Sequence, residues 1–235
     1  MTILNQIESY WDKRSSDFNE LRKQEMHSPN GQAWTQLILQ QLPPHTPLRI
    51  LDVGTGTGFF SFLLAHQGHQ VLGIDMSQQM IDHAKLNGTQ FNSNAQFQKM
   101  DATKLDFSTS EFDMLISRNV TWTLPDTEAA YAEWLRVLKP GGLLLNFDSD
   151  YGQTTFTNTK GHVHENMERD TLDECTNIKN KLPISQEVRP DWDKSILTAL
   201  GISQLFIEPN IRPLVQVDDN LKYEDVPIFM IKAIK

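Results

Sequence analysis

A glycine-rich turn near residue 55 constrains the fold of this chain more than any other feature. Residues 49–75 read RILDVGTGTGFFSFLLAHQGHQVLGID, so three glycines separate a strand-like apolar run from a helix-like run. Gly54 permits a tight turn, Gly56 lets a ligand approach the main chain, and Gly58 allows close packing of the helix on the strand. Asp75 ends the next strand-like run, where a carboxylate can accept hydrogen bonds from ribose hydroxyls. The stretch therefore predicts a nucleotide-binding corner.

Short apolar runs alternate with helical patterns along the first two thirds of the chain. We expect Ser77 to cap one helix and Gly88 to lie beyond the end of that helix. Such alternation, with nearly continuous apolar strands, is typical of a parallel sheet covered on both faces. We expect a turn at 139–142, strands at 49–53, 69–75, 95–101, 112–119 and 143–148, and helices at 2–26, 31–42, 59–68, 77–88 and 126–139.

The pattern breaks at about 150–190, which is polar and weakly periodic and is expected to form a lid insertion with short helices. A short helix at 191–201 and two strands at 203–210 and 226–235 follow, with no helical pattern between the strands. The spacing predicts an antiparallel pair at the edge of the sheet. The fold class predicted is α/β: a Rossmann-like, seven-stranded, mostly parallel sheet with an antiparallel last strand and helices on both faces. We expect an N-terminal helical cap over 1–44 and one domain over 45–235 that carries the lid after its fifth strand.

The composition limits the kinds of partner that this chain is expected to bind. Acidic residues outnumber basic residues by 30 to 21, a net charge of −9, which disfavours nucleic acid and anionic membranes as partners. Cys175 is the single cysteine, so no internal disulfide can form. No apolar run reaches the length of a membrane span, and the charged N-terminus does not resemble a signal peptide. We expect a cytoplasmic monomer or homodimer with no nucleic-acid and no membrane partner.

The glycine pattern also discriminates between nucleotides. A dinucleotide fingerprint would be G-x-G-x-x-G, whereas Phe59 stands where its last glycine is expected and the pattern here is G-x-G-x-G. Asp52, just before the loop, would repel a pyrophosphate but would suit a ligand with an amino group or a sulfonium. The charge argues against NAD(P) and for a cationic nucleotide.

Five ordered motifs then resemble the class I S-adenosylmethionine-dependent methyltransferases of the small-molecule type. They are LDVGTGTGFF, GIDMS, KMDATKL, FDMLISRN and LRVLKPGGLLL, which cover most of residues 45–150. The resemblance implies S-adenosylmethionine as cofactor and S-adenosylhomocysteine as product. It implies that Asp52 orients the amino end, that Asp75 holds the ribose and that Asp101 bonds the adenine. The cofactor-binding residues implied are Asp52, Gly54, Thr55, Gly56, Gly58, Asp75, Met76, Met80, Asp101, Ala102, Ser117, Arg118 and Asn119, with Tyr10, Trp11 and Arg14 from the cap.

The acceptor side has weaker signals. SRNVTWTLPD, after the fourth strand, is not the N/D-P-P-Y/F box of enzymes that methylate amino groups of nucleic acids or glutamine, and Cys175 does not follow a proline. Arg118 and Asn119 either face the methionine carboxylate or the acceptor, or form an ion pair and a turn. Catalytic candidates are His162, His164 and Asn119, and substrate candidates are Trp122, Tyr151 and Trp192. The alternatives for these side chains are core packing, helix capping and a polar lid.

Three functions compete. The first is transfer of a methyl group to a small-molecule acceptor. The second is a non-catalytic cofactor-sensing or metal-handling protein on the same fold, since function resides in the site rather than in the fold. His162, His164 and Cys175 are irregularly spaced and no C-x-x-C supports them, so no metal site is predicted. The third is an NAD(P)-dependent oxidoreductase, which Phe59 and Asp52 disfavour.

Overall fold

A seven-stranded sheet forms the centre of the protein. The computed structural model describes residues 2–43, 46–160 and 163–235. The strand order is β3-β2-β1-β4-β5-β7-β6, and β7 pairs antiparallel with both β5 and β6 while the other pairs are parallel. The predicted fold class is confirmed, including the antiparallel last strand. The strands are β1 (Arg49–Val53), β2 (Gln70–Asp75), β3 (Gln96–Lys99), β4 (Phe112–Arg118), β5 (Leu138–Asp148), β6 (Gln204–Glu208) and β7 (Phe229–Ile234).

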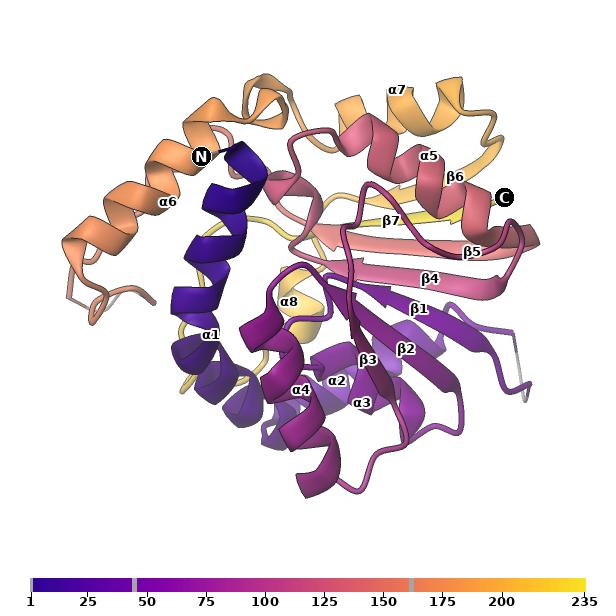
Figure 1. The fold of residues 1–235 in the computed structure, drawn as a ribbon, viewed down its shortest axis with the longest axis horizontal. Helices are drawn as coiled ribbons and strands as arrows, with labels where there is room; N and C mark the ends of the chain where they lie inside the picture. Colours follow the sequence, from indigo (N-terminus) through magenta and orange to yellow (C-terminus); the bar gives the residue numbers. More distant parts are fainter. Residues whose placement is uncertain (1, 44–45, 161–162) are drawn as a thin grey trace.

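Helices cover both faces of the sheet, and each face has its own apolar cluster. Figure 1 shows α5 and α7 on one side of the sheet and α2, α3 and α8 on the other. Trp134 and Leu197 join the first pair to the sheet, while Trp34, Phe60 and Val215 join the second group. The helices are α1 (Ile3–His27), α2 (Pro29–Leu39), α3 (Phe59–Ala65), α4 (Gln78–Gln90), α5 (Thr127–Val137), α6 (Arg169–Lys181), α7 (Asp191–Ala199) and α8 (Arg212–Val215), with 3-10 turns at Thr121–Thr123 and Pro183–Gln186.

Three expectations about element boundaries are wrong. Gly88 lies inside α4, because it keeps a helical φ and the helix continues to Gln90. The segment between β6 and β7 contains α8, which at four residues is too short to show a periodic pattern. The expected turn at 139–142 lies within β5, whose register with β4 shifts between Phe112 and Met114.

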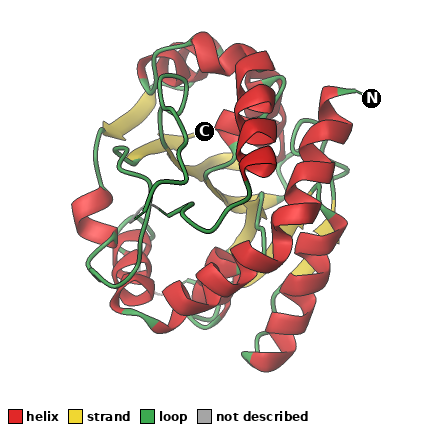
Figure 2. Cartoon of the chain, turned by 90° about the vertical axis from the view of Figure 1, so that its left-hand side faces the viewer, coloured by secondary structure: helices red, strands yellow, loops and turns green. Residues whose placement is uncertain are grey.

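The helices α1 and α6 lie at the carboxyl ends of the parallel strands. Figure 2 shows helices and long loops in front of these strand ends. The N-terminal helix is one continuous element that begins at a Thr2 cap, whose hydroxyl accepts the Asn5 N–H. Its buried face carries polar side chains, among them Asn19, Arg22 and Glu25. Among the described residues, no helix is both long and apolar enough to cross a bilayer.

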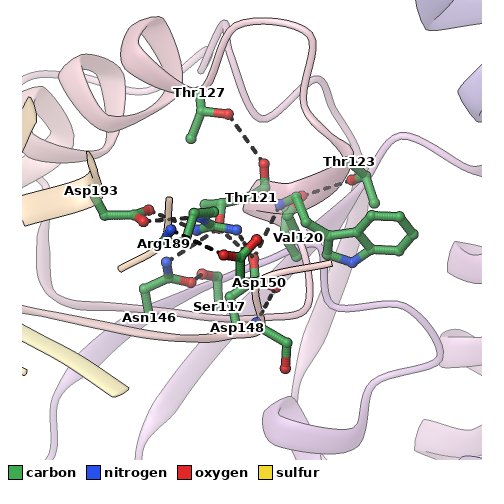
Figure 3. Close-up of polar contacts among 12 residues, drawn as sticks. Ser117, Val120, Thr121, Thr123, Thr127, Asn146, Asp148, Asp150, Arg189 and Asp193 are labelled. Atoms are coloured by element: carbon green, nitrogen blue, oxygen red, sulfur yellow. Dashed lines mark hydrogen bonds and ion pairs between the residues drawn. The ribbon is translucent and has the colours of Figure 1, made fainter. Parts of the chain in front are cut away.

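A buried ionic network joins the end of the insertion to the loop after β4 (Figure 3). Arg189 lies 3.4 Å from Asp148, at the end of β5, and 2.6 Å from Asp193, in α7, with all three side chains at most 1% exposed. The Arg189 guanidinium also donates to the Thr121 hydroxyl at 2.6 Å. Asp148 in turn accepts the Trp122 backbone N–H at 3.1 Å. The network therefore fixes where the chain runs after β4, which is next to the cavity described below.

Removing the Arg189 charge should strongly destabilise the fold. Arg189→Met leaves two buried carboxylates without their cation, and breaking such a pair costs about 3–5 kcal/mol. Urea unfolding followed by circular dichroism measures this loss. The matched control is Arg169→Met, since the Arg169 side chain is 87% exposed and 4.0 Å from Asp173, and such surface pairs contribute about 0–1 kcal/mol. Equal unfolding free energies for the two variants would contradict the assigned role of the network.

Candidate active site

One large cavity opens at the carboxyl ends of the parallel strands. Its volume is about 670 Å³, within the range of cofactor and small-molecule pockets. The wall comes from α1, the glycine loop, the ends of β2 and β4, and the described segments 151–156, 163–167 and 216–228. Open α/β sheets bind their ligands at this end. The described part of the chain thus gathers segments that are far apart in sequence around one site.

The glycine loop has the backbone that its sequence predicts. Gly54 has φ +64°, and a Cβ there would lie 2.2 Å from the Val120 side chain, so only glycine fits. Gly56 has φ +54°, and its N–H donates to an Asp75 carboxylate oxygen at 2.9 Å. The Thr55 N–H donates to the Ile74 carbonyl at 2.9 Å. The loop is therefore held against the end of β2 by hydrogen bonds from two consecutive residues.

A buried carboxylate, Asp52, and a partly buried one, Asp75, flank this loop. Asp75 accepts the Gly56 N–H on one oxygen and the Ser77 N–H on the other, both at 2.9 Å. Asp52 accepts the hydroxyls of Thr55 and Ser61 on one oxygen, both at 2.7 Å. Burial raises the pKa of each carboxyl to about 6, because the hydrogen bonds only partly offset the cost of desolvating the charge. A ligand that interacts favourably with the ionised form of either carboxyl would therefore offset this desolvation cost.

The turn after β3 forms the next part of the wall. One Asp101 oxygen accepts both the N–H and the hydroxyl of Thr103 at 2.8 Å. The Ala102 carbonyl accepts the Trp134 indole N–H at 2.9 Å, which fixes this turn to α5. The methionines of this region line the same part of the cavity as Asp101 and Ala102; they are Met76, Met80 and Met100.

For Arg118, the structure shows the ion-pair alternative. The guanidinium donates to both oxygens of Glu25, at 2.8 and 3.1 Å, and lies 4.5 Å from the centre of the Trp34 ring. Arg22 pairs with the same carboxylate. Burial works to raise the pKa of Glu25, but Arg118 and Arg22 outweigh it and lower that pKa to about 2. Burial first, and the nearby Arg118 charge second, lower the pKa of Arg22.

Asn119 lies in a turn, which is the second of the two interpretations that the sequence left open for this residue. It has φ +56°, and its N–H donates to the Phe147 carbonyl at 2.8 Å. Its side-chain oxygen is buried without a hydrogen-bond partner among the described residues. Because Asn119 also lines the cavity, its side chain stays a candidate for ligand contact.

The N-terminal helix closes the cavity from the other side. Tyr10, Trp11 and Arg14 all line it, and Arg14 donates to the Tyr10 hydroxyl at 3.1 Å. Burial raises the pKa of the Tyr10 phenol. Phe18, one turn further along, approaches Gly56 so closely that a Cβ at that glycine would lie 3.0 Å from the ring. The helix therefore covers the glycine loop directly.

Of the predicted residues that the structure describes, three do not line the cavity. Ser117 is fully buried and donates to Asn146 at 2.7 Å. Gly58 faces Phe62, which a Cβ would meet at 2.6 Å, so this glycine serves helix packing. Trp192 packs between two apolar clusters. For these three positions, a role in ligand binding stays a prediction.

Trp122 and Tyr151 do line the cavity, and Phe156 joins them. The Trp122 ring centre lies 4.8 Å from that of Tyr151 and 5.9 Å from that of Phe156. The Trp122 indole N–H has no hydrogen-bond partner among the described residues. Together these three rings form an aromatic wall, which is the name used below for Trp122, Tyr151 and Phe156.

Sequence reasoning selected His164 but missed the other residues that approach the site from distant segments, among them Glu224. His164 lies 2.6 Å from Glu224, and both line the cavity. Phe18, Arg22 and Tyr223 also line it, and no local motif singles them out. His162 lies outside the described residues. Within the described ranges, no group of three or more His, Cys, Asp and Glu side chains is arranged to hold a metal ion.

Residues 51–146 match the protein family described as "Methyltransferase domain". The demethylmenaquinone methyltransferase of Bacteroides fragilis is 28% identical over 144 residues, which cover 60% of this chain and 58% of that protein. The match thus spans little more than half of that relative's length.

Solved structures share the fold over nearly the whole chain. The phosphoethanolamine N-methyltransferase 2 of Haemonchus contortus, solved with phosphomonomethylethanolamine and S-adenosylhomocysteine, superposes with a TM-score of 0.72 at 18% identity, over 97% of this chain and 60% of that one. A Methanococcus maripaludis protein described as a putative S-adenosyl-L-methionine-dependent methyltransferase gives 0.63 at 20% identity, over 94% and 91%. Residues 51–146 thus match the methyltransferase domain family, and the chain has the fold of the class I S-adenosylmethionine-dependent methyltransferases.

Proposed function

We propose that this chain transfers the methyl group of S-adenosylmethionine to a small-molecule acceptor. The observation that carries the proposal is the position of the Asp75 carboxylate, which lies on the cavity wall and is fixed by the N–H groups of Gly56 and Ser77. A carboxylate has lone pairs beyond the two that these bonds use, so Asp75 retains acceptor capacity for ribose hydroxyls. The residues around it fit the remaining parts of the cofactor.

The adenine end fits the turn after β3. Asp101 provides an acceptor for the exocyclic amino group, and the Ala102 N–H provides a donor for a ring nitrogen. Met76, Met80 and Met100 supply polarizable apolar contacts for a flat base. This assignment supports the adenosyl half of the proposed site.

The amino-acid end fits the other side of the loop. Arg22 and Arg118 share the single Glu25 carboxylate, so these three residues carry one net positive charge. The Arg22 guanidinium lies 4.6 Å from the Phe18 ring, which covers Gly56, and Arg118 lies 5.1 Å from the Phe59 ring at the start of α3. A ligand carboxylate placed there would compensate the excess charge. Asp52, ionised, would attract the ammonium and the sulfonium on the same side.

Bound S-adenosylmethionine supplies an electrophilic methyl on a cationic sulfur, so the protein needs to position the acceptor in line and exclude water. Alignment of this kind contributes up to about 7–11 kcal/mol. The described residues can do both: α1 closes over the loop through Phe18, and the segments 151–156, 163–167 and 216–228 form the remaining wall. The non-catalytic alternative shares the binding site but would yield no methylated product.

Asp75→Asn should weaken binding of S-adenosylhomocysteine by about 10–100-fold, because each hydrogen bond to a charged group contributes about 1.5–3 kcal/mol. Isothermal titration calorimetry measures the affinity. Asp82→Asn is the matched control, since Asp82 is exposed on α4 and bonds only locally, to Gln78 at 2.8 Å. Wild-type affinity in Asp75→Asn would remove the ribose assignment.

Affinity for S-adenosylhomocysteine should fall as the pH drops through about 6. The pKa of Asp52 and that of Asp75 are each raised to about 6 in the free protein. A ligand that binds the ionised carboxylates must expel their protons below that pH, so affinity falls by up to about tenfold per pH unit for each carboxylate. Titrations between pH 5 and 8 test this prediction; an affinity independent of pH across that range would contradict it.

Arg22→Gln should discriminate between two ligands that share the adenosyl group. We expect about tenfold weaker binding of S-adenosylhomocysteine, which has a carboxylate, and unchanged binding of 5′-methylthioadenosine, which lacks the amino-acid part. The second ligand is the internal control for folding of the adenosyl site. Equal losses for both ligands would show that Arg22 acts on the fold of α1 rather than on the carboxylate.

A further inference from the structure

The loop after β4 carries Trp122 away from the glycine loop. Val120 lies so close to the glycine loop that a Cβ on Gly54 would meet its side chain at 2.2 Å. Trp122 follows two residues later, in the 3-10 turn Thr121–Thr123, and lines the cavity. A molecule that touches Trp122 is therefore next to the loop where the cofactor is proposed to bind.

The Trp122 indole N–H is a buried donor without a partner. None of the described residues accepts its hydrogen. Arg14 and Arg118 also have an unpartnered Nε on the cavity wall, but other nitrogens of both guanidinium groups donate hydrogen bonds. Indole has a single donor, so Trp122 is left entirely unsatisfied. A buried donor without a partner is costly, and a ligand oxygen that accepts this hydrogen would remove that cost.

The buried ionic network holds the backbone of this turn (Figure 3). Asp148 accepts the Trp122 backbone N–H at 3.1 Å and also the Thr121 hydroxyl. Arg189 donates to the same hydroxyl at 2.6 Å. From the start of α5, the Thr127 hydroxyl donates to the Thr121 carbonyl at 3.1 Å. The backbone of Trp122 is thus fixed by the fold itself, which suits a side chain that orients a ligand.

Aromatic neighbours hold the ring of Trp122. Its centre lies 4.8 Å from the ring centre of Tyr151 and 5.9 Å from that of Phe156, and both of these side chains are buried. Lys179 fixes the segment that carries them, because its ammonium donates to the carbonyls of Tyr151 and Thr154 at 3.1 and 2.5 Å. Aromatic surface of this kind suits a flat, apolar ligand. The aromatic wall therefore combines a large apolar surface with one donor that has no partner.

We propose that Trp122 selects the methyl acceptor: its ring packs against that molecule, and its indole N–H donates to an oxygen of it. This inference rests on the proposed methyl transfer and names the substrate class of the same site. The class is a flat, largely apolar molecule with a hydrogen-bond-accepting oxygen at its edge. The oxygen anchors the molecule beside the cofactor, while Tyr151 and Phe156 contact the flat body.

The competing explanation is a tryptophan that only packs. Trp122 also contacts the apolar cluster that joins α1 to α6. Loss of its ring would weaken that packing whether or not the N–H binds a ligand. A test therefore has to separate the N–H from the ring.

Two naphthalene probes of nearly the same shape make this separation. 2-Acetylnaphthalene has a carbonyl oxygen where 2-isopropenylnaphthalene has a methylene group. Their affinities are measured by calorimetry, without turnover, on protein saturated with S-adenosylhomocysteine. The ratio of the two affinities, the oxygen preference, should be about fivefold larger in the wild type than in Trp122→Phe, because only the wild type has the N–H that binds the oxygen.

Trp192→Phe is the matched control. It makes the same substitution at a tryptophan that packs against the same apolar cluster but does not line the cavity. We expect it to keep the wild-type oxygen preference. Affinity for S-adenosylhomocysteine, measured on both variants, should stay within twofold of wild type and shows that each variant is folded.

Nuclear magnetic resonance detects the hydrogen bond itself. The chain has five tryptophans, and the indole N–H signal that is missing from Trp122→Phe belongs to Trp122. In the wild type with S-adenosylhomocysteine, 2-acetylnaphthalene should move this proton signal downfield of its position with 2-isopropenylnaphthalene. The ring current of the naphthalene is common to both probes, so the difference reports the hydrogen bond. If Trp122→Phe does not fold, the signal is assigned through its link to the Trp122 backbone, and the wild type alone decides.

The outcomes separate this inference from the proposed function. If the wild-type protein does not bind S-adenosylhomocysteine, the proposed function fails. If it binds S-adenosylhomocysteine but neither probe, or keeps its oxygen preference in Trp122→Phe, or shows no downfield shift of the Trp122 signal, the assignment of Trp122 and of the substrate class is overturned while the cofactor site stands.

Discussion

The partly buried carboxylate of Asp75 makes the hydrogen bonds on which the site depends. It ends β2 and binds the N–H of Gly56 and that of Ser77, so one side chain fixes the glycine loop and the start of α4 together. Burial of this charge is costly, which its raised pKa of about 6 expresses. A carboxyl with a raised pKa on a cavity wall, near the buried Asp52 carboxyl, is typical of a group kept for ligand binding rather than for stability.

The N-terminal helix also buries polar side chains, which add less to stability than apolar ones would, and these side chains lie next to the site. Four of its six buried residues are polar, and two of these four contact the rest of the domain: Asn19 accepts from Asn87 at 2.7 Å, and Glu25 binds Arg118 at 2.8 Å. These contacts fasten α1 over the glycine loop with Phe18 against Gly56. The helix is thus attached through the cofactor side of the site, which links closure of the cavity to the residues that are proposed to hold the ligand.

Local sequence predicted the parts of the site that one loop can encode. The strand, the glycine turn and the acid of residues 49–75 lie within one βαβ unit, so their spacing alone indicates their geometry. Gly88 was assigned wrongly because a glycine near a helix end has the same sequence signal inside the helix as beyond it. Trp192, a predicted substrate contact, is partly buried and packs against two apolar clusters, because the sequence around a single aromatic residue does not show which side its ring faces.

The partners in pairs formed between distant segments could not be predicted, although an ion pair of Arg118 was one of the alternatives. Arg118 meets Glu25 across 93 positions of the chain, and His164 meets Glu224 through two loops without a periodic pattern. Arg22 and Glu25 have the appearance of solvent-facing charges on an amphipathic helix, and only the fold turns them inward. Long-range pairing of charges leaves no signal in one sequence, because it is set by topology rather than by spacing.

The most direct test of the central claim is a crystal structure of the protein with S-adenosylhomocysteine. The account predicts both ribose hydroxyls within hydrogen-bond distance of the Asp75 carboxylate, the adenine at Asp101 and the sulfur facing the aromatic wall. A ribose bound away from Asp75, or a cavity that takes up a dinucleotide with its pyrophosphate on the glycine loop in preference to S-adenosylhomocysteine, would contradict it.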